Sequence, residues 1–321
     1  MLPVCFNDVQ NALPAVHQVL KPTALYEWPG LSKLAGCQVY LKHENHQPVG
    51  AFKVRGGVHF VGLLNAEERK KGILGCSTGN HGQSLAFACR QFGVDCTIVV
   101  PEDNNPDKNE AILNLGAKLI EQGKDFDAAK EYLETELLPL GGIYVHSANE
   151  PKLIAGVGSM AMEIFEELAD PDAIIVPIGL GSGVCGTGIV ARHLRPETEI
   201  IGVQAIGADA VYQSWKQGLP KTIEAANTWA EGIATRSSAE MTLQIMQEVM
   251  DEAILVSDQE LRTACYHILK QTHNLVEGAG AASVAAMLQE RKKFAGKKVV
   301  CILSGGNLDL KELPAILAMG K

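Results

Sequence analysis

The sequence lacks the features that mark membrane, exported and disulfide-bonded proteins. Its 321 residues contain no run of about 18 or more apolar residues, so we expect no transmembrane helix. The first residues show no basic stretch followed by an apolar core, so no signal peptide is expected. Eight cysteines occur, but none lies in a Cys-x-x-Cys pair. We therefore expect buried thiols in a reducing, cytoplasmic setting.

Positive charge is also scarce. The 28 lysines and arginines are outnumbered by 37 aspartates and glutamates, which gives a formal net charge of −9 at pH 7. Such a surface repels phosphate backbones and anionic lipids, so neither nucleic acid nor a membrane is an expected partner. Hydrophobic residues make up 46% of the chain, and no long segment is strongly polar. We therefore expect a sizeable packed core and no disordered region.

Short apolar runs alternate with segments of helical spacing along most of the chain. Strands that are apolar throughout and separated by helices predict a parallel sheet covered on both faces, an α/β architecture. Two such series predict two closely docked lobes, 70–148 and 149–321, with a ligand cleft between them. The expected strands are 73–76, 96–100, 118–121, 142–146, 173–178, 199–204, 252–256 and 298–303, and the expected helices are 79–92, 107–116, 125–138, 153–168, 184–193, 258–272 and one from 279.

Four polar or glycine-rich segments lie where strands should end. The first is a loop at 50–57, Gly-Ala-Phe-Lys-Val-Arg-Gly-Gly, which holds Lys53 between small and aromatic residues. A partly desolvated lysine has a lowered pKa and can act as a nucleophile or base. Taken alone, this segment fits a surface lysine beside a turn better than a functional one.

The second segment is Ser-Thr-Gly-Asn-His-Gly-Gln-Ser at 77–84, between a strand and a helix. Its hydroxyls and the free N–H groups of a helix N-terminus would suit a carboxylate. An ordinary helix cap with a tight turn explains it about equally well. The fourth segment, Ser-Gly-Gly-Asn at 304–307, follows an apolar strand. The hydroxyl of Ser304 could bond a buried heteroatom, although a simple turn is the plainer interpretation.

The third segment, Gly-Leu-Gly-Ser-Gly at 179–183, follows an apolar strand and opens a helix. Glycines let a backbone wrap a phosphate that the helix dipole attracts. The loop alone could hold a dinucleotide, a mononucleotide or pyridoxal 5′-phosphate (PLP). The spacing does not fit a dinucleotide fingerprint, since 201–204 ends in no acid, and the Lys-Ser/Thr of a P-loop is missing. A nucleotide-dependent oxidoreductase is therefore disfavoured.

In their order and positions, the four segments resemble fold-type II PLP enzymes of the threonine dehydratase and serine racemase family. The similarity runs from about Leu20 to about Leu310 and includes Lys108, 116–117, 153–156 and 277–280. It implies a two-lobed, tryptophan synthase β-like fold with parallel-rich twisted sheets flanked by helices. A large PLP-binding domain would comprise 1–69 and 149–321, with a small domain inserted at 70–148. A homodimer that binds a small amino-acid substrate is implied as well.

The resemblance also implies roles for single residues. Lys53 would carry PLP as a Schiff base, with Phe52 beside the ring, Asn80 bonded to its 3′-oxygen, Ser304 at the pyridine nitrogen and Glu277 near the ring edge. Ser77 and Thr78 would join Lys53 as catalytic residues. The phosphate would lie against Gly179, Leu180, Gly181, Ser182 and Gly183, and the substrate carboxylate against Ser77, Thr78, Gly79, Asn80 and His81.

The activity implied is that of an ammonia-lyase, or dehydratase. It would eliminate the β-hydroxyl of threonine, serine, phenylserine or hydroxyaspartate to give a 2-oxo acid and ammonia. A serine at the ring nitrogen cannot hold it as a cation, which favours loss of a β-group over protonation elsewhere. A racemase needs a second base, a serine in racemases, where Thr78 stands with a crowding methyl. Racemisation and β-replacement stay open as alternatives, although His81 argues against cysteine synthases. The intact Lys53 argues against a catalytically dead scaffold.

Some positions depart from the family pattern. Gln204 and Ala210 stand where many members place a Glu and an Asp that bind a divalent cation. Losing two carboxylates removes the charge that a hard cation needs, so no metal is expected there, although the neighbouring Asp209 could compensate. Apolar residues at 48–51 and Val157 hint at an apolar or aromatic β-substituent.

Overall fold

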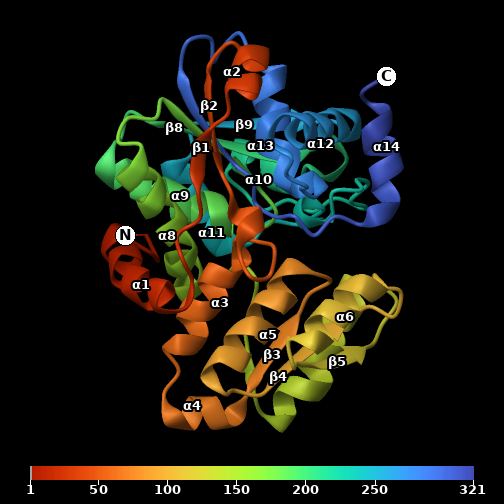
Figure 1. Ribbon diagram of the computed structural model, residues 1–321. Coiled ribbons are helices and arrows are strands. Elements are labelled where there is room, and N and C mark those ends of the chain that lie inside the picture. The colour runs from red at the N-terminus through yellow and green to blue at the C-terminus, as the bar shows by residue number, and fades with distance from the viewer. Residues whose placement is uncertain (1) are drawn as a thin grey trace.

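The computed structural model describes residues 2–321 and has two lobes, each built on its own sheet (Figure 1). All neighbouring strands are parallel except β1 and β2, so the expected α/β fold with parallel-rich sheets is confirmed. The large lobe orders its strands as β1 (Leu25–Glu27), β2 (Gln38–Lys42), β10 (Lys298–Ile302), β7 (Ala173–Pro177), β8 (Glu199–Ala205) and β9 (Glu252–Val256), and the small lobe as β5 (Lys118–Glu121), β4 (Cys96–Val100), β3 (Ile73–Cys76) and β6 (Ile143–Tyr144).

Helices cover both faces of the large sheet, which explains why its central strands are apolar throughout. Along β10, Val299 and Cys301 face one core while Val300 and Ile302 face the other. None of the described helices is long and apolar enough to span a membrane. One layer contains α2 (Pro29–Ala35), α12 (Asp258–Thr272), α13 (Gly278–Gln289) and α14 (Leu313–Ala318), and the other contains α1 (Phe6–Val19), α8 (Pro151–Glu167), α9 (Ser182–Leu194), α10 (Ala210–Gln217) and α11 (Glu240–Val249).

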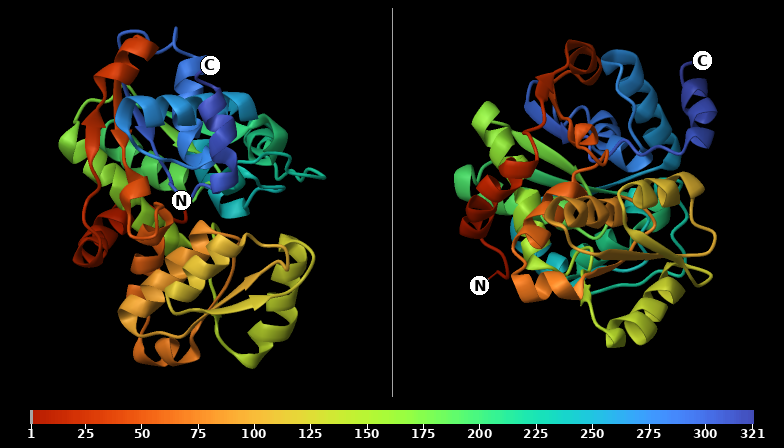
Figure 2. Two further views of the ribbon diagram at one scale, coloured as in Figure 1. Left: turned by 45° about the vertical axis from the view of Figure 1, so that its right-hand side comes forward. Right: turned by 60° about the horizontal axis from the view of Figure 1, so that its bottom comes forward.

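The small lobe lies below the large one and is a sheet between two helical layers (Figure 2). Helices α5 (Asn80–Phe92) and α6 (Pro106–Asn114) pack on one face, and α7 (Phe126–Tyr132) packs on the other. The segment 125–138 is helical from Phe126 onward, as expected, but only its first part, α7, is α-helical. The chain leaves α7 through a π-helical turn, Leu133–Leu137, and a 3₁₀ turn, Leu138–Leu140. Pro139 has no N–H to continue the α-helical ladder.

Lys53 begins a helix, α3 (Lys53–Gly62), so the prediction of a loop over 50–57 is wrong from this residue onward. The glycines that suggested a loop serve close packing. A Cβ at Gly56 would lie 2.9 Å from the carbonyl oxygen of Leu153 in α8. Helix α3 also packs on α5 and continues toward α4 (Ala66–Lys71), so it connects the two lobes (Figure 1). The domain limits 1–69 with 149–321 and 70–148 stay a prediction.

A cluster of buried charges fixes α3. The guanidinium of Arg55 donates to Glu44 through Nε at 2.7 Å and to Glu163 of α8 through Nη1 at 2.6 Å. Lys42, the last residue of β2, pairs with Glu163 at 2.7 Å. Burial alone would raise the pKa of Glu163, but Arg55 and Lys42 outweigh it and lower the pKa to about 2. The start of α3 is thereby tied to both the sheet and α8, two residues beyond Lys53.

Replacing Arg55 by Met should lower the free energy of unfolding by about 3–5 kcal/mol, because the carboxylates of Glu44 and Glu163 would stay buried without their main partner. The control Lys70→Gln breaks an exposed pair with Glu67 and should cost less than about 1 kcal/mol. Urea unfolding followed by circular dichroism measures both. Equally small effects would contradict a supporting role for the buried cluster.

Candidate active site

The amine of Lys53 lies where the two lobes meet. Its Nζ donates to the Oγ of Ser182, at the start of α9, at 2.9 Å, and to the carbonyl of Ser147, beyond β6, at 3.2 Å. It also lies 5.3 Å from the centroid of the Phe52 ring. Desolvation by the surrounding protein lowers the pKa of Lys53 to about 8. A large neutral fraction therefore exists near that pH, as a nucleophile or base requires.

The loop 179–183 lies between β7 and α9 and presents an anion site. Gly181 has φ = 103°, a left-handed conformation that glycine adopts without strain. It caps α9, so the first N–H groups of that helix have no intrahelical partner and face the loop at the positive end of the dipole. Thr242 of α11 braces the loop by donating to the carbonyl of Leu180 at 2.5 Å. These groups fit a phosphate.

The segment 77–81 presents a second anion site, between β3 and α5. The Oγ of Ser77 accepts a hydrogen bond from the N–H of Gly79 at 3.2 Å, which fixes the turn around the half-buried Thr78. Gly79 precedes Asn80, the first residue of α5, so the N–H groups of the first turn lack intrahelical partners. They suit a carboxylate, and binding of the substrate there stays a prediction.

His81 differs from its neighbours because its ring is already engaged. Its Nε2 is hydrogen-bonded to the carbonyl of Val145 at 3.0 Å, and the side chain is buried. Burial and the nearby Lys53 lower the pKa of His81 to about 3, so the ring is neutral. The imidazole therefore brings no positive charge to this loop.

Asn80 is held from both ends of its amide. Its Nδ2 donates to Glu277 Oε1 at 2.7 Å, and its Oδ1 accepts from Asn307 Nδ2 at 2.7 Å. Asn307 also donates to the carbonyl of Val49 at 2.9 Å. No role was expected for Asn307 from the sequence, although it belongs to the segment 304–307. Its only signal was its position shortly after a strand end.

The remaining contacts bring all four segments together. The N–H of Phe52 donates to the carbonyl of the buried Ser304 at 3.1 Å. A Cβ at Gly183 would lie 3.4 Å from the Phe52 ring, and one at Gly305 would lie 2.3 Å from Glu277 Oε1. Direct contacts thus join the segment of Lys53 to the phosphate loop, to the segment of Ser304 and, through Asn307, to Asn80. The donor groups of these segments fit PLP, although the roles of Ser304, Asn80 and Glu277 toward its ring stay predictions.

The position at which many family members bind a cation is occupied differently. Gln204 is buried, its Nε2 donates to Thr235 Oγ1 at 3.1 Å, and its Oε1 accepts from the N–H of Tyr212 at 2.9 Å. Ala210 begins α10 and has no donor atom in its side chain. Within residues 2–321 no group of three or more His, Cys, Asp and Glu side chains is suited to a metal. The absence of a cation at this position stays a prediction.

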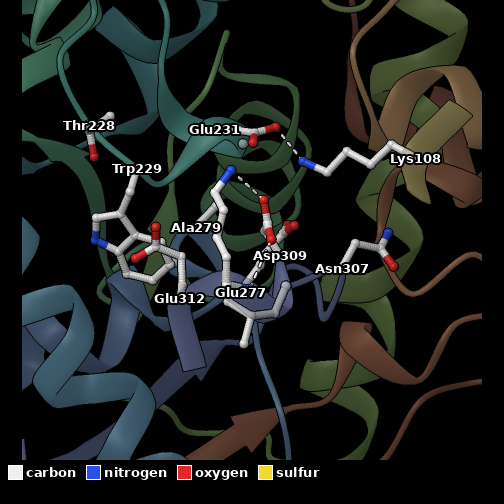
Figure 3. Close-up of a pocket in the computed structure, with 13 residues that line it drawn as sticks. Lys108, Thr228, Trp229, Glu231, Glu277, Ala279, Asn307, Asp309 and Glu312 are labelled. Carbon is white, nitrogen blue, oxygen red and sulfur yellow. Dashed lines mark hydrogen bonds and ion pairs between the residues drawn. The ribbon is translucent and has the colours of Figure 1, made fainter. Parts of the chain in front are cut away.

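Beside Glu277 lies a cavity of about 170 Å³ that Lys108, Glu231 and Asn307 also line (Figure 3). Lys108 and Glu231 form an ion pair from the small lobe to the large lobe. Glu277 itself is buried, and desolvation raises its pKa to about 7 despite the opposing effects of Lys108 and Asn80. Sequence reasoning missed Glu231, which carries no motif that marks it as part of a site.

Replacing Glu277 by Gln should stabilise the apoprotein at high pH only. Because the folded-state pKa of about 7 lies above the ordinary value of 4.5, the wild type loses stability as pH rises through that interval. A glutamine does not titrate, and it can still accept from Asn80. Urea unfolding should show the variant about 1–3 kcal/mol more stable at pH 8 and equally stable near pH 4. A difference that does not change with pH would contradict the raised pKa.

The chain is similar to known proteins over nearly its whole length. The family model described as "Pyridoxal-phosphate dependent enzyme" matches residues 16–305. The chain is 35% identical over 317 residues to an L-threonine ammonia-lyase of Thermotoga maritima, which spans 99% of this chain and 79% of the relative. It is 33% identical to an L-threo-3-hydroxyaspartate ammonia-lyase of Saccharomyces cerevisiae, across 99% and 98% of the two chains. The solved serine racemase of Dictyostelium discoideum superposes with a TM-score of 0.89 at 32% identity, across 95% and 99%. The chain therefore belongs to the family of pyridoxal-phosphate dependent enzymes.

Proposed function

We propose that this protein is an ammonia-lyase that removes the β-hydroxyl of a β-hydroxy amino acid and releases a 2-oxo acid and ammonia. The observation that supports this proposal most directly is the position of the Lys53 amine. It is held between the small and large lobes, and its pKa is lowered to about 8. Relatives named L-threonine ammonia-lyase and L-threo-3-hydroxyaspartate ammonia-lyase support the same reaction class.

The residues around Lys53 divide the task of holding cofactor and substrate. PLP, when bound, supplies the electron sink that makes the Cα–H of an amino acid acidic. The first turn of α9, from Ser182, would hold its phosphate, and Ser304 and Asn80 would hold its ring. The free N–H groups at the start of α5 would hold the substrate carboxylate and so fix the position of the Cα–H.

Lys53 is the residue that moves protons. Once the amine of the substrate has displaced it from the cofactor, its neutral amine accepts the Cα proton, and the resulting ammonium can stay hydrogen-bonded to Ser182 and the carbonyl of Ser147. The same ammonium donates a proton to the β-hydroxyl as the Cβ–O bond breaks, so that water leaves and one residue serves as base and then acid. Ser304 presents a hydroxyl and no carboxylate, which favours this loss over protonation at another carbon.

We also infer that the enzyme works as a cytoplasmic homodimer. All eight cysteines are free, and seven of them are buried, as expected of a protein in a reducing compartment. The dimer follows from the family resemblance alone. Sedimentation of the holoenzyme as a monomer would contradict it.

A 2-oxo acid assay tests the proposed reaction. We expect 2-oxo acid and ammonia in equal amounts from at least one of threonine, serine, hydroxyaspartate and phenylserine, offered as threo and erythro forms where these exist. Lys53→Ala should lower the rate by more than about 100-fold, because it removes both the base and the acid. EDTA, which removes divalent cations, should leave the rate unchanged. Gln204 and Ala210 stand where many family members have the Glu and Asp that bind such a cation.

Activity restricted to interconverting enantiomers would sink the lyase proposal and favour a racemase that uses Thr78. Loss of activity with EDTA that Mg²⁺ restores would contradict the absence of a cation.

A further inference from the structure

Lys108 is a charged residue that takes no part in the proposed elimination reaction. It lies in the first turns of α6, in the small lobe, and its side chain is only 11% exposed. Its ammonium reaches Glu231, which begins the 3₁₀ turn Glu231–Ile233 of the large lobe (Figure 3). A nearly buried cation that crosses between lobes at the edge of the site is unlike an ordinary surface lysine.

The stem of Lys108 lies on the segment expected to hold the substrate carboxylate. A Cβ at Gly79 would meet the Cδ of Lys108 at 3.6 Å, its Nζ at 3.9 Å and its Cε at 4.0 Å. Gly79 caps α5, whose free N–H groups form the proposed carboxylate site. The ammonium is therefore within a short side-chain movement of an anion bound there.

This carboxylate site has no other cation assigned to it. The ring of His81 is neutral and bonded to Val145, and Lys53 is expected to be occupied by the cofactor. Backbone N–H groups and hydroxyls can bind a carboxylate, but a full positive charge strengthens such hydrogen bonds considerably. The positive charge that would complete the site is the ammonium of Lys108, which is now paired with Glu231.

We propose that Lys108 is a substrate-binding residue whose ammonium passes from Glu231 to the α-carboxylate of the incoming amino acid. Glu231 is then a competing anion that holds Lys108 in place until the substrate arrives. The inference rests on the proposed function only in that the substrate is an α-amino acid. Glu231 also adjoins Gly232, whose carbonyl oxygen lies 2.6 Å from where a Cβ at Gly179 would be, so the exchange takes place beside the phosphate loop.

Loss of the Lys108 pair would not separate the lobes. Asn105 Nδ2 donates to Asp309 Oδ2 at 3.0 Å, and Arg236 pairs with Asp127, and both contacts join the same two lobes. Variants of Lys108 should therefore keep the fold and retain the cofactor. Ligand binding can then be measured apart from folding.

The test uses the PLP-loaded enzyme and two ligands without a β-leaving group, L-alanine and L-alaninamide, in calorimetric titrations. Alaninamide lacks the carboxylate. Lys108→Gln should weaken L-alanine binding by about 10- to 100-fold, as expected for a lost hydrogen bond to a charged group, and change alaninamide binding by less than about twofold. Lys108→Arg should recover most of the loss. Glu231→Gln should tighten L-alanine binding, because it removes the competitor.

The matched control is Lys311→Gln. Lys311 lines the same cavity and pairs with Asp309, but its side chain is 73% exposed, and its loss should leave both titrations unchanged. Equal weakening of both ligands by Lys108→Gln would overturn the proposal and indicate a structural role. Weakening of L-alanine binding by Glu231→Gln would overturn it too, as would a wild type that does not bind L-alanine. If no 2-oxo acid forms while L-alanine binding still depends on Lys108, only the lyase proposal fails.

Discussion

The buried ion cluster around Arg55 is the constraint on which the site depends. Arg55 holds Glu44 and Glu163 in the interior, so the first turn of α3 cannot shift relative to the large sheet or to α8. Lys53 lies two residues earlier on the same helix, and its amine has to reach groups from both lobes at once. Because the backbone at the start of α3 is fixed, the flexible side chain of Lys53 can place its amine at one position, as a catalytic base requires.

The electrostatics of the site follow from this arrangement. Desolvation lowers the pKa of Lys53 and His81 and raises that of Glu277, so each shift favours the neutral form. The centre is therefore poor in fixed charge, and binding depends on helix N-termini, amides and hydroxyls. The ion pair of Lys108 and Glu231 lies at the edge of this centre, beside Glu277.

Most of the fold could be predicted from the sequence, because each strand is marked by the apolar residues within its own short segment. The apolar runs at 73–76 and 96–100 coincide with β3 and β4, since buried parallel strands need apolar residues on both faces. The run at 118–121 coincides with the edge strand β5, where only Leu119 and Ile120 are half-buried. The glycines near Lys53 misled, because a turn and a close helix contact both require glycine. The partners of Asn80 and Lys108 could not be predicted, since Asn307 and Glu231 lie more than 100 residues away and meet them only through the docking of the lobes.

The central claim is that Lys53 carries the cofactor, and chemical trapping tests it most directly. Reduction of the holoenzyme with sodium borohydride converts a lysine Schiff base into a stable secondary amine. Mass mapping of the digested protein should then find the pyridoxyl label on the peptide that contains Lys53, and Lys53→Ala should abolish the label. A label on a different lysine, or none in a protein that has bound PLP, would contradict the account.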